Sequence, residues 1–194
     1  MKKIIYIVIA VVVLVGGYVL INKKNSTKDT GPIKIGAVLN MTGTFANQGE
    51  NSQKGINLAI EEINANGGVL GRTLETNIQD NLGDSPSGAI SAMHSLSAQN
   101  VRLIIGPNLT PSANVLAPLT EKENVVFIAP SVGSEKFAEL SPRTFNVFPP
   151  NKFDSFALAE YLYNEKGFRK IAIFGSQQEW ERDQALFVKT RFEQ

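Results

Sequence analysis

Residues 33–72 read IKIGAVLNMTGTFANQGENSQKGINLAIEEINANGGVLGR, and this stretch decides the fold expected for the chain. Its first seven residues form a short, mostly apolar run that is typical of a buried β-strand. Farther along, apolar residues recur at the spacing of one helix face: Ile56, Ala59, Ile60 and Ile63. Asn66-Gly67-Gly68 then supplies residues that tolerate positive φ, as a helix end requires. The stretch therefore predicts a strand, a loop and an amphipathic helix.

The same alternation continues along the rest of the chain. Helices are expected to open at Ser85-Pro86 and at Thr110-Pro111, because a capping hydroxyl there precedes proline at the first helical position. The second of these should run to about Asn124, and further helices are expected around Phe156 and from Glu179. Further strands are expected at residues 74–78, 101–105, 125–128, 144–148 and 170–174. Strands that alternate with helices predict an α/β fold with a doubly wound parallel sheet.

Ligands of such sheets bind beyond the carboxyl ends of the strands. The loops expected at that edge cover residues 40–49, 81–85, 106–110, 130–134 and 175–180. This prediction rests on the order of the elements alone.

The N-terminus carries an uncharged apolar run from Ile4 to Ile21, with lysine pairs near both ends. In a helix this run would span about 27 Å, close to the ~30 Å hydrocarbon core of a bilayer. We expect a signal-anchor helix over residues 1–24, with a cleaved signal peptide as the alternative, and a polar linker over residues 25–32. Residues 33–148 would then form a first ligand-binding lobe, and residues 149–194 would begin a second.

The composition excludes several classes of function. The chain has no cysteine, which rules out disulfides, cysteine nucleophiles, zinc–thiolate sites and iron–sulfur clusters. Four of its 19 basic residues lie in the first 24 positions, so the remainder is slightly acidic and offers no basic surface for nucleic acid. No phosphate-binding glycine loop, zinc-protease motif or serine-nucleophile elbow occurs. His94, the single histidine, is interpreted as packed or at the rim of a helix face. We expect no catalytic residue, metal site or cofactor.

Neutral polar side chains gather in the expected ligand loops. They are Asn108, Thr110, Ser112, Ser131 and Ser134. Helix N-termini favour an anion such as a carboxylate, and neutral donors and acceptors suit reversible binding better than bond breaking. The alternative is that these side chains only cap turns and helices. Trp180, the only tryptophan, would either pack under its loop or form an apolar wall against a ligand.

Three segments together resemble the leucine/isoleucine/valine-binding protein family, the type I periplasmic binding proteins. The first ends in EEINANGGVLGR (residues 61–72), which is similar to the family's A-x-E-x-I-N-A-x-G-G-x-x-G-R pattern. The second is LIIGPNLTPSANVLAPLTEKENVVFIAPSVGS (103–134), and the third is RKIAIFGSQQEW (169–180). The resemblance implies two α/β lobes around a ligand cleft, a hinge near residues 146–151, and a second lobe that is only begun within this chain.

The resemblance also implies roles for single residues. It places the hydroxyl of Thr110 where the family holds a ligand carboxylate. It places Ser131 where a backbone carbonyl receives the ligand amine. Trp180 matches an aromatic residue that covers the ligand from the second lobe, and Asn108 lies in the same loop as Thr110.

Other positions depart from the family pattern. Gly133 stands where amino-acid binders usually have a threonine, and Ser134 is expected to supply the missing hydroxyl. Gln48 stands where a tyrosine often lines the cleft. Glu181 replaces a glycine that often follows the aromatic residue at Trp180.

The expected function is that of an extracytoplasmic solute-binding protein of an ABC transporter. It would reversibly bind an amino acid of the branched-chain type, or a similar small carboxylate, between its lobes. Its partners would be that ligand, the transporter permease, and the membrane through the N-terminal helix; if that helix is cleaved, the protein would be periplasmic or secreted. The alternative is a ligand-sensing extracellular domain of a membrane receptor, and an enzyme is disfavoured.

Overall fold

A parallel five-stranded sheet forms the centre of the protein in a computed structural model that describes residues 31–194. The sheet has the strand order β2-β1-β3-β4-β5. Its strands are β1 (Ile33–Leu39), β2 (Leu74–Asp80), β3 (Leu103–Ile105), β4 (Val126–Ala129) and β5 (Thr144–Asn146). These strands confirm the prediction of a parallel α/β sheet, although β3 and β5 are each two residues shorter than expected. The order reverses between β1 and β3, which is the arrangement of a doubly wound fold.

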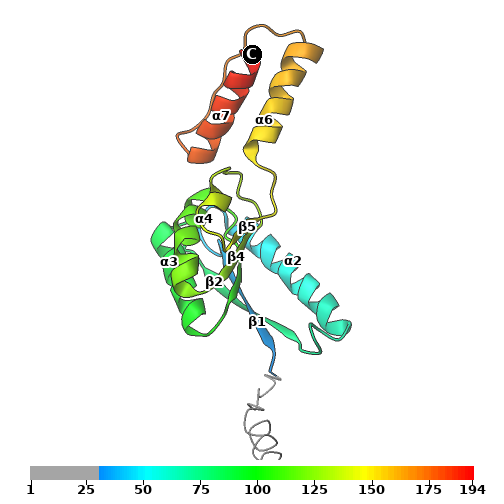
Figure 1. Ribbon diagram of the computed structural model, residues 1–194, viewed down its shortest axis with the longest axis vertical. Helices are drawn as coiled ribbons and strands as arrows, with labels where there is room; N and C mark the ends of the chain where they lie inside the picture. The colour runs from blue at the N-terminus through cyan, green and yellow to red at the C-terminus, as the bar shows by residue number, and fades with distance from the viewer. Residues whose placement is uncertain (1–30) are drawn as a thin grey trace, which may run out of the picture. The chain divides into compact units, whose positions relative to one another are not determined.

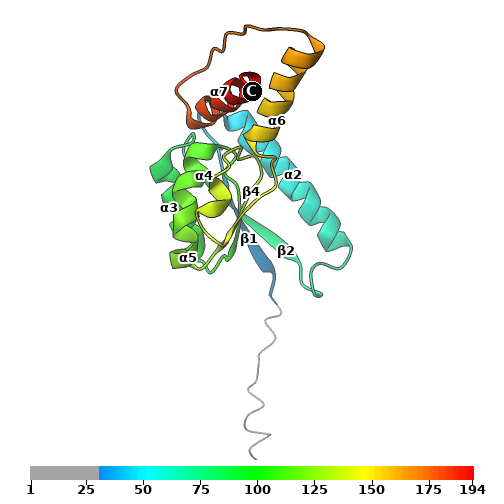
Figure 2. The ribbon, with the colours of Figure 1, turned by 45° about the horizontal axis from the view of Figure 1, so that its top comes forward.

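Helices cover both faces of the sheet, with α2 on one side and α3 to α5 on the other (Figures 1 and 2). Their bounds are α2 (Ala46–Ala65), α3 (Pro86–Ala98), α4 (Thr110–Leu116) and α5 (Thr120–Glu123). Short 3₁₀ turns occupy Ala117–Leu119 and Phe137–Glu139. The chain then continues through α6 (Asn151–Glu160), a π-helical turn at Tyr161–Glu165, and α7 (Glu179–Phe192).

The main core lies between the sheet and α3 to α5. Val38, Ile104 and Phe127 from the strands are completely buried, as are Met93, Leu96 and Leu116 from the helices. The rings of Phe127 and Phe137 meet edge to face with centroids 5.5 Å apart, a favourable geometry for aromatic pairs. This face of the sheet carries most of the buried apolar surface of the described residues.

Helix α2 packs more loosely on the opposite face, where Gly49 is its only buried residue. A Cβ atom on Gly49 would lie 2.1 Å from the carbonyl oxygen of Asn40, so only glycine lets the first turns of α2 pass this close to the end of β1. At the other end, the side chain of Asn64 accepts from the N–H of Leu74 at 2.7 Å and donates to its carbonyl at 2.9 Å. These contacts fix both ends of the helix against the sheet.

The predicted caps have different outcomes. Ser85 is the N-cap of α3, and its hydroxyl accepts from the N–H of Gly88 at 3.3 Å, as expected. The prediction for Thr110 is wrong: Leu109 is the N-cap of α4, and Thr110 is the first helical residue. The expected single helix to Asn124 is also wrong. It divides into α4, a 3₁₀ turn and α5 around Pro118, because proline has no N–H to donate within a helix.

The strand expected at residues 170–174 does not form. These residues belong to no helix or strand, and Phe174 is 96% exposed. A strand needs hydrogen bonds from a neighbouring strand, and within residues 31–194 none pairs with this segment. Helices α6 and α7 flank it and pack on each other through the edge-to-face ring pair Phe156–Phe187, and Tyr163 in the π-helical turn after α6 forms a second such pair with Phe192 of α7.

The signal-anchor helix predicted over residues 1–24 lies outside the described residues, as does most of the predicted linker. Within residues 31–194, no helix combines the length and the apolar character needed to cross a bilayer. Backbone contacts group residues 32–194 into one unit, and the lobe boundary at residue 148 stays a prediction.

Candidate ligand-binding site

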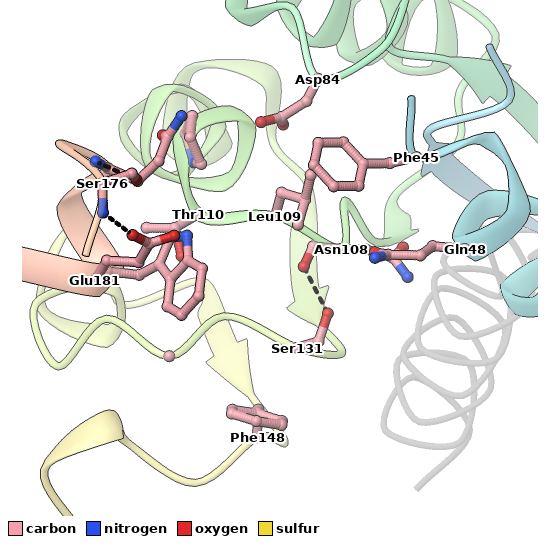
Figure 3. A pocket seen from close by; sticks show the side chains of 14 residues that line it. Phe45, Gln48, Asp84, Asn108, Leu109, Thr110, Ser131, Phe148, Ser176 and Glu181 are labelled. Atoms are coloured by element: carbon pink, nitrogen blue, oxygen red, sulfur yellow. Dashed lines mark hydrogen bonds between the residues drawn. The ribbon is translucent and has the colours of Figure 1, made fainter. Parts of the chain in front are cut away.

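A cavity of about 550 Å³ lies at the carboxyl ends of the strands (Figure 3). All five loops predicted to meet there contribute to it. Its lining consists of Phe45, Gln48, Asp84, Asn108, Leu109, Thr110, Pro111, Ser131, Gly133, Phe148, Ser176, Gln178, Trp180 and Glu181. Cavities of roughly 300–1,000 Å³ with a few placed polar groups are typical of small-molecule sites.

The loops after β1 and β3 flank the point where the strand order reverses, and both reach the cavity. Six of the seven residues predicted to bind ligand line it: Gln48, Asn108, Thr110, Ser131, Gly133 and Trp180. The seventh, Ser134, is buried but is not part of the lining. The geometry therefore gives no support to the prediction that Ser134 replaces the missing threonine hydroxyl.

Hydrogen bonds hold the loops after β3 and β4 together at the floor of the cavity. The hydroxyl of Ser131 donates to the backbone carbonyl of Asn108 at 2.6 Å (Figure 3). The side-chain nitrogen of Asn108, Nδ2, donates to Ser52 Oγ at 2.8 Å, and this bond ties the same loop to α2. Asn108 Oδ1 is buried and has no hydrogen-bond partner among the described residues.

Thr110 opens α4 and is 4% exposed. Its hydroxyl is not occupied as an N-cap, because α4 has no side-chain cap. Ser112, one turn farther, is completely buried and does not line the cavity. Of the two hydroxyls in this segment, Thr110 is therefore the one placed to contact a ligand.

The side chain of Asn151, the first residue of α6, packs directly against Gly133. A Cβ atom on Gly133 would lie 2.0 Å from Asn151 Oδ1, so the asparagine side chain fills the space that a residue 133 side chain would need. The backbone N–H of Asn151 donates to the carbonyl of Gly133 at 3.0 Å. The departure from threonine at position 133 thus has a structural cause, which lies 18 residues away in sequence.

The start of α7 and the loop before it form a separate wall of the cavity. Ser176 N–H donates to the Glu181 carboxylate, and Gln178 N–H donates to Ser176 Oγ at 3.2 Å. Two hydrogen bonds join this wall to the rest of the site. Asn114 Nδ2 on α4 donates to Glu179 Oε2 at 3.1 Å, and Asn151 Nδ2 donates to the Trp180 carbonyl at 3.5 Å.

Sequence reasoning missed several lining residues, above all the aromatic Phe45 and Phe148 and the acidic Asp84 and Glu181. The carboxyl group of Asp84, a residue of the predicted loop 81–85, borders the cavity (Figure 3). Burial raises the pKa of Asp84 because it penalises the charged form, and the nearby hydroxyl and N–H of Ser112 offset this only in part. Phe45, Asp84 and Glu181 lie within or beside predicted ligand loops, so for them the loops were the available signal, whereas Phe148 falls at the end of the strand predicted at residues 144–148.

His94 lies away from the cavity, on the surface of α3. Its Nδ1 is 3.0 Å from Glu123 Oε1, and the histidine side chain is 47% exposed, which agrees with a position at the rim of the helix. Ser97 Oγ donates to Glu123 Oε2 at 2.5 Å, and this bond is the main reason that the pKa of Glu123 is lowered.

The lining of the cavity offers side chains that can bind and orient a ligand, but no hydroxyl there is hydrogen-bonded to a histidine or a carboxylate that could activate it.

The sequence profile described as periplasmic binding protein matches residues 32–194. The Leu/Ile/Val-binding protein of Citrobacter freundii is 27% identical over 161 residues, which cover 81% of this chain and 43% of that protein. Both this match and the profile agree with the resemblance noted in the sequence.

Two solved structures are similar in fold. One is the branched-chain amino acid transporter substrate-binding protein LivJ from Streptococcus pneumoniae in complex with isoleucine, with TM-score 0.78 and 24% identity over 84% of this chain and 47% of LivJ. The other is a solute-binding protein of an ABC transporter from Rhodopseudomonas palustris in complex with 3,4-dihydroxybenzoic acid, with TM-score 0.77 and 25% identity over 84% of this chain and 44% of that one. The chain spans less than half the length of each of these proteins.

Proposed function

Because this chain belongs to the periplasmic binding protein family, we propose that it is the extracytoplasmic solute-binding component of an ABC transporter. Members of this family are solute-binding proteins rather than enzymes. The proposed ligand is an amino acid, of the branched-chain type or related to it, or a similar small carboxylate. The observation that carries the proposal is the cavity itself, in which five loops bring neutral polar groups and aromatic rings together.

The polar groups suit reversible recognition. Thr110 offers a hydroxyl donor, and Asn108 Oδ1 is an acceptor with no partner among the described residues. Phe45, Phe148 and Trp180 supply apolar surface for the body of a ligand. A ligand that fills such a site replaces its contacts with water by contacts with the protein, without any bond being made or broken.

The proposed ligand contacts follow from these positions. The Thr110 hydroxyl would donate to the ligand carboxylate, and the Ser131 backbone carbonyl would accept from the ligand amine. Trp180 would cover the ligand from the wall formed by α7. Gly133 and Gln48 would contribute shape rather than charge.

We propose that the protein acts outside the cytoplasm and is held at the membrane by the apolar helix predicted over residues 1–24. Cell fractionation and mass spectrometry of the mature N-terminus test this. Recovery of the intact N-terminus in the membrane fraction is expected, and a soluble form that lacks residues 1–24 would contradict the anchor. The transported solute would pass to a permease of the same transporter. A receptor's sensing domain, the alternative, gains no support from the transport proteins that this chain is similar to.

Ligand titration of the full chain tests the proposal directly. Trp180 is the only tryptophan, so a saturable change in its fluorescence reports on the cavity. Replacing Thr110 by valine should weaken binding by about 1–3 kcal/mol, because a buried hydrogen bond to the ligand is lost. Thr190→Val is the matched control, because Thr190 is an exposed residue of α7 outside the cavity. Equal affinity of both variants would exclude Thr110 as a ligand contact.

A further inference from the structure

The charges in the cavity are all of one sign. Its lining includes two carboxylates, Asp84 and Glu181, and none of the lining residues that the structure describes is lysine, arginine or histidine. Neither carboxylate forms an ion pair within residues 31–194. An anionic group in a partly enclosed cavity is costly unless an opposite charge is close by, so the cavity is complementary to a cation.

Glu181 is held in place by the protein rather than left free to turn to solvent. One of its carboxylate oxygens accepts a hydrogen bond from the N–H of Ser176 (Figure 3). Its neighbour in sequence, Trp180, also lines the cavity, and both belong to the first turn of α7. A carboxylate beside an indole ring is a favourable site for an ammonium group, which is attracted by the negative charge and by the face of the ring.

Asp84 gives a second and separate reason to expect a cation. Its Oδ1 atom is buried without a hydrogen-bond partner among the described residues, and the only polar groups acting on its carboxyl group are the neutral hydroxyl and N–H of Ser112. Burial penalises its charged form and raises its pKa. An ammonium group in the cavity would supply the opposite charge that the neutral groups of Ser112 do not, and would offset this penalty. Phe45 borders the same part of the cavity as Asp84 (Figure 3). The lining thus has three aromatic residues, the other two being Phe148 and Trp180.

We propose that this cavity selects a solute with net positive charge, namely an amino acid whose side chain ends in an ammonium group at the end of an apolar stem. The proposal rests on the proposed function and narrows its ligand class. A neutral zwitterion brings one positive and one negative charge, so the net negative charge of Asp84 and Glu181 stays as it is. A second ammonium group balances them in part, and a benzoate-type anion would add to the repulsion. Glu181 is the residue assigned to the additional ammonium group.

Two amino acids that differ only in that group provide the test. L-Lysine is L-norleucine with an ammonium group in place of one terminal hydrogen, so their chains are matched in length and apolar stem. In the full chain, titrated at neutral pH by calorimetry and by Trp180 fluorescence, lysine should bind at least about tenfold more tightly than norleucine. 3,4-Dihydroxybenzoate, an anion without an amine, should bind most weakly.

The Glu181→Gln variant keeps the size of the side chain and removes its charge. It should reduce lysine affinity by about tenfold relative to norleucine affinity, so that the preference for lysine disappears. Glu61→Gln is the control, since Glu61 is exposed on α2 and outside the cavity. It should keep the preference for lysine.

The possible outcomes separate this inference from the proposed function. If norleucine or leucine binds as tightly as lysine, the cation preference is wrong while the proposed function stands. Tight binding of 3,4-dihydroxybenzoate alone would likewise overturn the cation preference, and it would keep only the small-carboxylate form of the proposed function. If no amino acid and no carboxylate binds, both proposals fail. A preference for lysine that persists in Glu181→Gln would overturn the assignment to Glu181.

Discussion

Residues 33–148 and residues 149–194 contain the same kinds of sequence pattern, but nearly all of the buried apolar side chains lie in the first region. In the first region, Val38, Ile104 and Phe127 have no exposed surface. In the second, Phe174 is 96% exposed and Ile173 is 44% exposed, although both lie in a run that reads as a strand. The difference teaches that an apolar run becomes a strand only where neighbouring strands complete its hydrogen bonds, and the first region alone supplies them.

A pair of phenylalanines should give the largest contrast between the regions. Phe127→Ala removes a completely buried ring that packs on Phe137, so we expect the free energy of unfolding to fall by about 3–5 kcal/mol. Phe174→Ala removes an exposed ring and should change it by less than about 0.5 kcal/mol. Urea unfolding followed by circular dichroism measures both. Similar losses for the two variants would mean that Phe174 is buried in solution and that the regions do not differ as described.

A second contrast lies within α2 and sharpens the comparison inside the first region. Gly49→Ala places a methyl group 2.1 Å from the carbonyl oxygen of Asn40, and we expect a loss of about 1–3 kcal/mol in unfolding free energy. Gly55→Ala meets no atom within 4 Å and should raise it by up to about 1 kcal/mol, because alanine favours a helix. Thermal unfolding of the two variants should shift in opposite directions, and a stabilised Gly49→Ala would contradict the close approach of α2 and β1.

The contact between Gly133 and Asn151 links the two regions, and a double-mutant cycle measures the strength of that link. Gly133→Thr alone should destabilise the protein, because its Cβ atom would overlap the Asn151 side chain. Adding Asn151→Ala removes the overlapping atoms. The unfolding free energy of the double variant should therefore be about 1–2 kcal/mol higher than the sum of the two single effects predicts. Strict additivity in urea unfolding would show that the two side chains do not compete for the same space.

The smallest expected effect is a difference in sign between the pH-dependent contributions to stability of Asp80, which ends β2, and Asp84, which lies in the loop after it. Burial raises the pKa of Asp84 in the folded state, so its carboxyl contributes to stability at low pH and loses that contribution as pH rises through this pKa. Burial also acts to raise the pKa of Asp80, but hydrogen bonds from Thr42, Leu82 and Met41 outweigh it and lower the value. The contribution of Asp80 is therefore present at neutral pH and is lost as pH falls.

Neutral variants turn this difference into a measurement. Asp84→Asn should increase the unfolding free energy at neutral pH, and asparagine also tolerates the positive φ of 69° at this position. Asp80→Asn should decrease it at neutral pH and flatten the loss in acid. Chemical unfolding at several pH values between neutral and about pH 4 tests both, and the same sign for the two variants would refute the assigned pKa shifts.

The sequence predicted the parallel sheet and the edge that carries the cavity, because strand order and loop position follow from local patterns. The apolar run at Ile33 and the Ser85-Pro86 start of α3 needed no long-range information. The division of the helix after Thr110 was missed, although Pro118 was a visible signal. The competition between Gly133 and Asn151 could not be predicted, because it depends on where α6 begins relative to the loop after β4.

The two acidic lining residues were also beyond reach of local patterns. Asp84 looks like an ordinary turn residue, and only the fold brings it to the same cavity as Glu181, 97 positions later in the sequence. A sequence shows that a residue is charged, but the cost of that charge depends on burial and on the absence of a counter-charge nearby.

The sheet also has a consequence for synthesis of the chain. All five strands and α2 to α5 come from one uninterrupted stretch that ends at Asn146, and no later segment that the structure describes is inserted between them. A polypeptide that emerges N-terminus first can therefore complete this sheet while residues beyond it are still being added. Helices α6 and α7 would then dock onto a surface that already exists, so the wall containing Trp180 is assembled after the sheet and its loops.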